Sequence, residues 1–97
     1  MSRVSGKAYF VYVLWSDSGR RFYTGIAEDP DYRLAQHNDS AGKHWTVRLR
    51  PWRIVYRELQ PDFSSARRRE NELKKQKSGN GFFKKTGLNP ILFGRRS

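Results

Sequence analysis

The chain has 97 residues, of which 36% are hydrophobic, and its 20 Lys and Arg against nine Asp and Glu give a net charge of +11. This length allows one domain with a modest core, and the absence of cysteine excludes disulfides and cysteine-based zinc sites. No apolar stretch is long enough to span a membrane, so the sequence predicts a cytoplasmic protein without a membrane partner. The excess of positive charge indicates a polyanionic partner such as nucleic acid.

Two strands joined by a tight turn are predicted first. Residues 8–15 are continuously apolar, which is typical of a central strand that is covered on both faces. Residues 16–19 have the composition of a turn, and residues 20–26 then alternate between two faces, with Tyr23 opposite its apolar neighbours. Gly25 indicates a bulge or a close backbone approach beside Tyr23.

A short helix and a basic loop follow the two strands. Asp29 before Pro30 is typical of a helix start, because the carboxylate can cap the first turn and proline is tolerated at the first helical position. We expect this helix to end near Asn38. Residues 39–51 then form a loop that mixes cations with an indole.

A third strand and a second helix complete the predicted framework. Residues 52–59 alternate, which would place Ile54 and Tyr56 on the same face of the strand. An apolar stripe of helical period predicts a second helix over residues 65–77. A turn and a short final helical segment are predicted after it, at Asn80-Gly81 and over residues 82–88.

The side chains on the first helix and the first two strands suggest phosphate chemistry. Arg33 and His37 stand four residues apart, so they share a helix face and could hold two oxygens of one phosphate; taken alone, they are more often two solvated surface residues. Tyr12 and Tyr23 lie on neighbouring strands and could reach one face of the sheet. A phenol there could orient a water molecule, or both could be tyrosines at the edge of the core.

Glu70 is a carboxylate on the apolar stripe of the second helix, which it shares with Ala66 and Leu73. A carboxylate in such a position is costly unless it is paired or binds a cation. One carboxylate, a substrate phosphate and waters are a common way of holding Mg²⁺. The alternative is an ion pair with a cation of the same helix, namely Arg67, Arg69 or Lys74.

Two groups of residues are candidates for nucleic-acid binding. Residues 67–97 hold ten Lys and Arg against two Glu, so the second helix would contact the phosphate backbone. In the loop, cations can contact phosphates and an indole can stack on an unpaired base, although a solvated loop is an equal alternative. The candidates are Lys43, Trp45, Arg48, Arg67, Arg68, Lys74 and Lys75.

Four short motifs occur in a characteristic order: Val11-Tyr12, Tyr23-Thr24-Gly25, Arg33-Leu34-x-x-His37-Asn38 and Ala66-Arg67-Arg68-Arg69-Glu70. Together they resemble the GIY-YIG nuclease superfamily, most closely its small stand-alone bacterial members, which are related to the N-terminal nuclease domain of a bacterial excinuclease. The resemblance implies an α/β (α+β) fold in which helices flank a three-stranded antiparallel sheet. We expect a single domain over residues 1–97, with a core at about 8–78 and a basic C-terminal extension at 79–97.

The resemblance also implies roles for five residues. Tyr12 and Tyr23 would position or activate the attacking water, and Arg33 would stabilise charge on the scissile phosphate. His37 matches a frequent active-site histidine, and Glu70 matches the acid that anchors a single Mg²⁺ or Mn²⁺. The motifs differ from the usual pattern in two places, where Phe10-Val11-Tyr12 lacks the glycine of the family name and His44-Trp45-Thr46 replaces Lys-Tyr-Thr. A late polar residue of the family corresponds to Asn80 or Asn89.

The sequence thus predicts a metal-dependent endonuclease that hydrolyses phosphodiester bonds in DNA with little sequence specificity, as in DNA repair or recombination. The alternative is a non-catalytic nucleic-acid-binding module that retains the nuclease fold. A third hypothesis is a protein that is active only with a protein partner. The sequence leaves open whether the substrate is DNA or RNA and how many strands it has.

Overall fold

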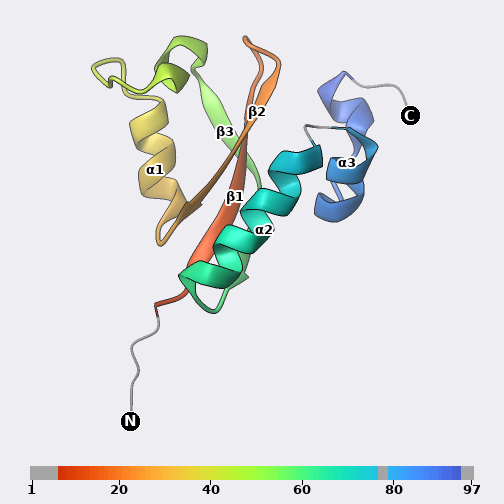
Figure 1. Cartoon of the computed structure of the whole chain (residues 1–97). Helices are drawn as coiled ribbons and strands as arrows, with labels where there is room; N and C mark the ends of the chain where they lie inside the picture. Colours follow the sequence, from red (N-terminus) through yellow and green to blue (C-terminus); the bar gives the residue numbers. More distant parts are fainter. Residues whose placement is uncertain (1–6, 77–78, 95–97) are drawn as a thin grey trace.

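The computed structural model describes residues 7–76 and 79–94. The strands β1 (Tyr9–Ser16), β2 (Arg21–Ala27) and β3 (Trp52–Gln60) form one antiparallel sheet in the order β2-β1-β3 (Figure 1). Between and after the strands lie the helices α1 (Pro30–His37), α2 (Phe63–Gln76) and α3 (Asn80–Thr86), with two short 3₁₀ helices, η1 (Trp45–Leu49) and η2 (Pro90–Phe93). The predicted α+β fold, a three-stranded antiparallel sheet flanked by helices, is confirmed.

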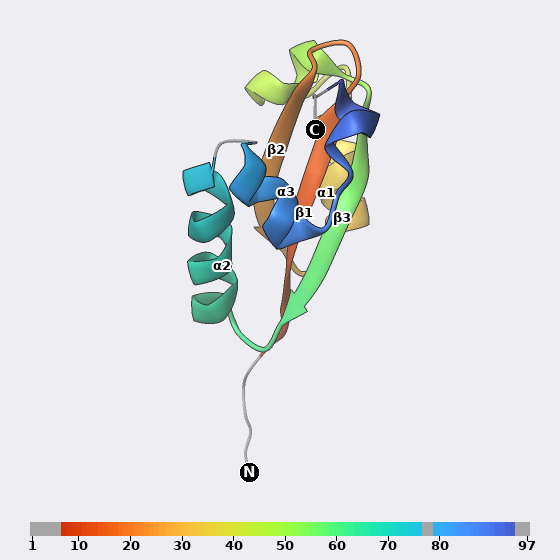
Figure 2. The same cartoon turned by 90° about the vertical axis from the view of Figure 1, so that its right-hand side faces the viewer.

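The helices lie on both faces of the sheet. Figures 1 and 2 show α1 on one face and α2 with α3 on the other. Val11, Val13 and Trp15 of β1 point toward α2 and α3, where they pack in one buried cluster with Leu73. Tyr12, between them in sequence, belongs to a second buried cluster on the opposite face. The prediction that the first strand is central and covered on both faces is therefore confirmed.

A β-bulge in β3 changes the faces of its side chains. Val13 pairs with Tyr56, whereas Leu14 pairs with Ile54, so Val55 is the extra residue. Such an insertion reverses the alternation beyond it. Ile54 consequently packs with the Tyr12 cluster and Tyr56 with the opposite one. The prediction that Ile54 and Tyr56 share a face is wrong for this reason.

Two helix starts differ from the sequence prediction. The helix α2 begins at Phe63 rather than Ser65, because the Asp62 side chain accepts a hydrogen bond from the backbone N–H of Ser65 at 2.8 Å and so caps the first turn. Asn80 and Gly81 form the start of α3 rather than a turn. The predicted end of the second helix at Lys77 lies outside the described residues. The start of α1 is as predicted, with the Asp29 side chain as its cap.

The C-terminal segment contributes to the core. Phe82, Phe83 and Phe93 are all buried and pack in the same cluster as the inner face of β1. The Arg69 guanidinium, which donates to Glu58 of β3 and to the Lys85 carbonyl oxygen, ties α2 to the sheet and to α3. Core packing therefore continues beyond residue 78. In residues 7–76 and 79–94 no helix has the length and apolar character needed to cross a bilayer.

We predict that Phe82→Ala strongly destabilises the protein. Phe82 is 2% exposed, so its removal leaves a cavity and should lower the free energy of unfolding by about 3–5 kcal/mol. Leu92→Ala is the control, because Leu92 is 71% exposed and should change stability by less than about 0.5 kcal/mol. Urea denaturation of both variants measures the difference, and equal losses would contradict the packing.

Candidate active site

Tyr12 is the central residue of the candidate site, and it is fully buried in the middle strand of the sheet. Its pairing partner on β2 is Gly25, where an added Cβ atom would lie 2.7 Å from the Tyr12 hydroxyl oxygen. No real side chain tolerates that contact, so glycine lets the phenol lie against the backbone of β2. The pairing at Gly25 is regular. The close approach predicted there is therefore confirmed, but its partner is Tyr12 rather than Tyr23.

His37, in the last turn of α1, contacts this phenol. Its Nε2 atom lies 3.3 Å from the Tyr12 hydroxyl oxygen, and the imidazole is only 3% exposed. The next residue, Asn38, fixes the end of α1 to β3: its side-chain amide donates to the Trp52 carbonyl oxygen at 3.0 Å and accepts from the Trp52 N–H at 2.6 Å. This pair of hydrogen bonds holds His37 in place over the sheet.

A chain of hydrogen bonds continues beyond His37 into the loop. The Nδ1 atom of His37 lies 2.6 Å from the Thr46 hydroxyl oxygen, which lies 2.9 Å from Nδ1 of His44. The Thr46 N–H also donates to Nδ1 of His44, at 3.3 Å. Thr46 is fully buried, and its carbonyl oxygen accepts from the Trp52 indole at 2.7 Å. The loop and the imidazole are thus one connected polar network.

Tyr23 lies at the centre of the aromatic part of the site. It shares a face of the sheet with Tyr12, and the two ring centroids are 6.3 Å apart. The ring of His37 is 4.7 Å from Tyr23, and that of Trp45, which is 49% exposed, is 6.1 Å away. The two tyrosines therefore reach the same face of the sheet, and one of the predicted nucleic-acid contacts lies beside them.

The charges of Arg33 and Glu70 both act on the Tyr12 hydroxyl. The pKa of Tyr12 is raised to about 12, mainly by burial and then by the neighbouring Tyr23. The charge and hydrogen bond of Arg33 act in the opposite direction, and the carboxylate of Glu70 adds a smaller increase. A phenol with this pKa is a neutral hydroxyl at pH 7. The phenol, the guanidinium and the carboxylate are therefore electrostatically coupled, although they come from three different elements.

His37 is likewise neutral in the folded protein. Its pKa is lowered to about 4, mainly by burial, with smaller electrostatic contributions from His44 and Arg33. A neutral imidazole has one N–H and one lone pair, so it can accept a proton at neutral pH.

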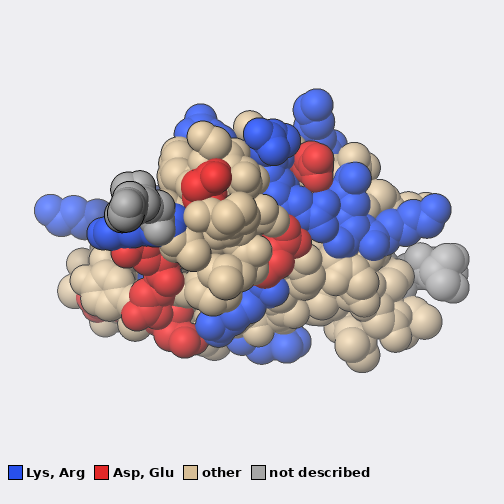
Figure 3. Space-filling view, turned by 90° about the horizontal axis from the view of Figure 1, so that it is seen from below, with Lys and Arg blue, Asp and Glu red and all other residues tan. Residues whose placement is uncertain are grey.

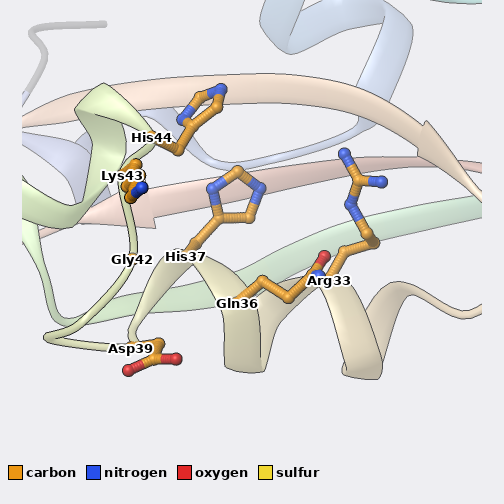
Figure 4. Close-up of a pocket in the computed structure, with 7 residues that line it drawn as sticks. All are labelled: Arg33, Gln36, His37, Asp39, Gly42, Lys43 and His44. Atoms are coloured by element: carbon orange, nitrogen blue, oxygen red, sulfur yellow. The ribbon is translucent and has the colours of Figure 1, made fainter.

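Arg33 and His37 open onto one cavity, as their spacing on the helix predicts. Both side chains project from the same side of α1 in Figure 4. The cavity has a volume of about 390 Å³, and its remaining lining residues are Gln36, Asp39, Gly42, Lys43 and His44. Except for Asp39, its charged groups are cationic, which suits an anionic ligand.

Glu70 has a half-buried carboxylate on α2. Its side chain is 13% exposed and forms an ion pair with Lys74 at 2.9 Å, which is one of the pairings expected from the sequence. An oxygen ligand of this kind fits a hard divalent cation that is completed by waters and a substrate phosphate. Residues 7–76 and 79–94 contain no group of three or more His, Asp or Glu side chains that is placed to hold a metal ion.

The seven predicted nucleic-acid contacts are all exposed, and they belong to two places. In the loop, Lys43 lines the cavity, whereas Trp45 and Arg48 belong to η1. The other four are exposed residues of α2. Figure 3 shows Lys and Arg gathered mainly toward one side of the face seen from below, beside smaller groups of Asp and Glu. The loop group is Lys43, Trp45 and Arg48, and the helix group is Arg67, Arg68, Lys74 and Lys75.

Neither candidate for the late polar residue lines the cavity beside Arg33. Asn80 is the first residue of α3, and the Asn89 side chain caps η2 by accepting from the Ile91 N–H at 3.0 Å. In contrast, sequence reasoning missed Thr46 as a member of the site. The only signal was its place in His44-Trp45-Thr46, where the family often has Lys-Tyr-Thr.

We predict that His37 titrates near pH 4 and makes the protein sensitive to acid. The unfolded chain binds this proton near the ordinary pKa of 6.5, and the folded protein only near about 4. The contribution of His37 to the free energy of unfolding is therefore fully present above pH 6.5. It is lost as the pH drops toward 4, by up to about 1.4 kcal/mol per pH unit. NMR titration of the imidazole and urea denaturation across this range test it. His37→Gln should lose this part of the pH dependence, and a His37 pKa near 6.5 would contradict the prediction.

We predict that Gly25→Ala displaces the Tyr12 ring. The new methyl group would overlap the phenol, so the variant should lose about 1–3 kcal/mol of stability and the hydrogen bond between Tyr12 and His37. Gly81→Ala is the control, because its Cβ atom would meet only the end of the Gln76 side chain, which can swing away. Urea denaturation and the His37 ring resonances measure both effects. Unchanged resonances in Gly25→Ala would contradict the close contact.

Comparison with known proteins identifies the family of this chain. The GIY-YIG catalytic domain family matches residues 8–83. Curated relatives include UPF0213 proteins of Staphylococcus aureus strains Mu3, Mu50 and COL, each 37% identical over 67 residues, which is 69% of this chain and 80% of the relative. Their names state no activity, and no solved structure matches the chain. Because the family match spans well over half of the sequence, the chain belongs to the GIY-YIG family, a family of nucleases that act on nucleic acids and generally use divalent metal ions.

Proposed function

We propose that this protein is a metal-dependent endonuclease that hydrolyses phosphodiester bonds in DNA with little sequence specificity. The strongest support is the hydrogen bond between the buried Tyr12 hydroxyl and a neutral His37, beside the guanidinium of Arg33. A role in DNA repair or recombination and a cytoplasmic location belong to the same proposal. RNA is the alternative substrate.

In the proposed reaction, Tyr12 and His37 manage the proton of the attacking water. The water oxygen forms a bond to phosphorus while the bond from phosphorus to the leaving oxygen breaks, and the leaving oxygen takes a proton from solvent. The attacking water gives its proton to the Tyr12 oxygen as the Tyr12 hydroxyl passes its own to Nε2 of His37, which lies 3.3 Å away. Tyr12 need not become a free phenolate, which suits its raised pKa.

Arg33 supplies fixed positive charge to the phosphate. A guanidinium that already points into the cavity stabilises negative charge that develops on the phosphate oxygens. In the free protein the same charge lowers the pKa of His37. A bound phosphate would neutralise it, so the pKa of His37 would rise in the complex and the imidazole would become a better proton acceptor.

Glu70 is the residue that would hold the divalent cation, Mg²⁺ or Mn²⁺. When bound, such an ion supplies Lewis-acid stabilisation of the phosphate oxygens. The carboxylate now pairs with Lys74, so Lys74 would be released to contact the DNA backbone together with the exposed cations of α2. Contacts of that kind give binding with little base preference and a steep dependence on salt.

We predict cleavage of labelled DNA in Mg²⁺ or Mn²⁺, tested on single-stranded, duplex and branched substrates. Tyr12→Phe should lower the rate on the order of 10²–10³-fold, because it removes only the proton-transferring oxygen, and Glu70→Gln should lower it similarly. The controls are Tyr32→Phe, at an exposed phenol on α1, and Glu72→Gln, which makes the same charge change on α2 at a side chain bonded to Arg69. Both should cleave normally.

Three outcomes would separate the alternatives. Undiminished cleavage by Tyr12→Phe and Glu70→Gln would eliminate the mechanism. DNA binding that survives EDTA and Glu70→Gln, without product from any substrate, would favour the non-catalytic binding module. Activity that appears only when cell extract is added would favour a protein that depends on a partner.

A further inference from the structure

We propose that Thr46 is a positioning residue that, together with His44, holds His37 in the tautomer protonated on Nδ1. This tautomer leaves the Nε2 lone pair facing the Tyr12 hydroxyl. Only the catalytic consequence of this inference rests on the proposed function; the tautomer itself is a property of the free protein.

The assignment begins at His44. The backbone N–H of Thr46 donates to Nδ1 of His44 at 3.3 Å, and a backbone N–H can only donate. The Nδ1 atom of His44 therefore carries a lone pair. The Thr46 hydroxyl oxygen lies 2.9 Å from the same nitrogen, so it is the hydroxyl that places its hydrogen there. The other arrangement would set two lone pairs against each other.

The Thr46 hydroxyl has one hydrogen, and the contact with His44 occupies it. This determines which ring nitrogen of His37 is protonated. The oxygen can only accept from Nδ1 of His37, 2.6 Å away, so Nδ1 must bear a hydrogen. Burial keeps His37 neutral, with its pKa lowered to about 4, and a neutral imidazole has one N–H. Its Nε2 atom therefore carries the lone pair, and the hydrogen bond with Tyr12 runs from the phenol to the imidazole.

The opposite tautomer leaves an unsatisfied contact. If Nε2 of His37 bore the hydrogen, Thr46 would have to donate to Nδ1 of His37. Its oxygen would then face the Nδ1 lone pair of His44 at 2.9 Å, with no hydrogen between them. Two acceptors at this distance repel each other, which should favour the tautomer protonated on Nδ1 by roughly fivefold or more.

Thr46 is held rigidly enough to impose this choice. It is fully buried, and its carbonyl oxygen accepts from the indole of the buried Trp52 at 2.7 Å. His44 caps η1, which begins next to Thr46. The other ionisable or charged groups that face His37 are Tyr12, Tyr23 and Arg33, and none of them contacts its Nδ1 atom among the hydrogen bonds of the described residues.

The catalytic consequence follows from the direction of the hydrogen bond. With Nε2 free, His37 can take a proton from the Tyr12 hydroxyl at each turnover. With Nε2 protonated, it would present an N–H to the phenol and could not act as a base. Removal of the Thr46 hydroxyl should therefore lower kcat, on the order of 10- to 100-fold as for other groups that orient a histidine, and leave KM for DNA unchanged.

The test is heteronuclear NMR of the histidine side chains in the full chain near pH 7, which distinguishes protonated from unprotonated ring nitrogens. The wild type should show His37 protonated on Nδ1 alone. Thr46→Val should lose this preference, whereas Thr46→Ser, which keeps the hydroxyl, should retain it. His44→Leu, at an exposed position, removes the acceptor and should shift His37 toward the Nε2-protonated form, whereas His44→Asn keeps an acceptor oxygen and should not.

Wild-type His37 protonated on Nε2 would overturn the inference, even if Thr46→Val does not fold. An unchanged tautomer in both Thr46→Val and His44→Leu would overturn it as well. If the tautomers behave as expected but the wild type cleaves no DNA, the proposed function fails and the inference stands. If the wild type cleaves DNA and its kcat is the same in Thr46→Val, the catalytic consequence is wrong.

Discussion

The hydrogen bond between Tyr12 and His37 is the interaction on which the rest of the site depends. It joins the middle strand of the sheet to the last turn of α1, and it is buried at both ends. Gly25 makes room for the phenol, and Asn38 fixes the end of the helix that carries the imidazole. Burial raises the pKa of Tyr12 and lowers that of His37, so both rings are neutral at pH 7.

Much of the fold could be predicted because its signals are local. The apolar run of the central strand, the alternation of β2 and the Asp29 cap each depend on a few neighbouring residues. The bulge at Val55 could not be predicted in this way, because an extra residue leaves no mark in the apolar run of residues 54–56. The start of α3 could not be predicted from local signals either. Asn80 and Gly81 favour turns, but the burial of Phe82 and Phe83 outweighs that preference.

The candidate site could be predicted only in part. The motifs indicated the main polar residues, and the structure places Tyr12, Tyr23 and His37 on one face of the sheet. The role of Thr46 depends on the directions of hydrogen bonds among three side chains, and those directions exist only once the loop has folded against α1. The partner of Glu70 was equally open, since three cations of the same helix were within reach and Lys74 is the one that binds it.

The paired hydrogen bonds of Asn38 with Trp52 fix the base of the loop independently of its tip. They close the loop at its base, so the imidazole and the start of β3 keep their places whatever happens at the loop tip near Gly42 and Lys43. Lengthening a flexible loop costs little, about 0.6 kcal/mol for each doubling. A change confined to the tip would therefore alter the lining of the cavity and leave the contact between Tyr12 and His37 in place.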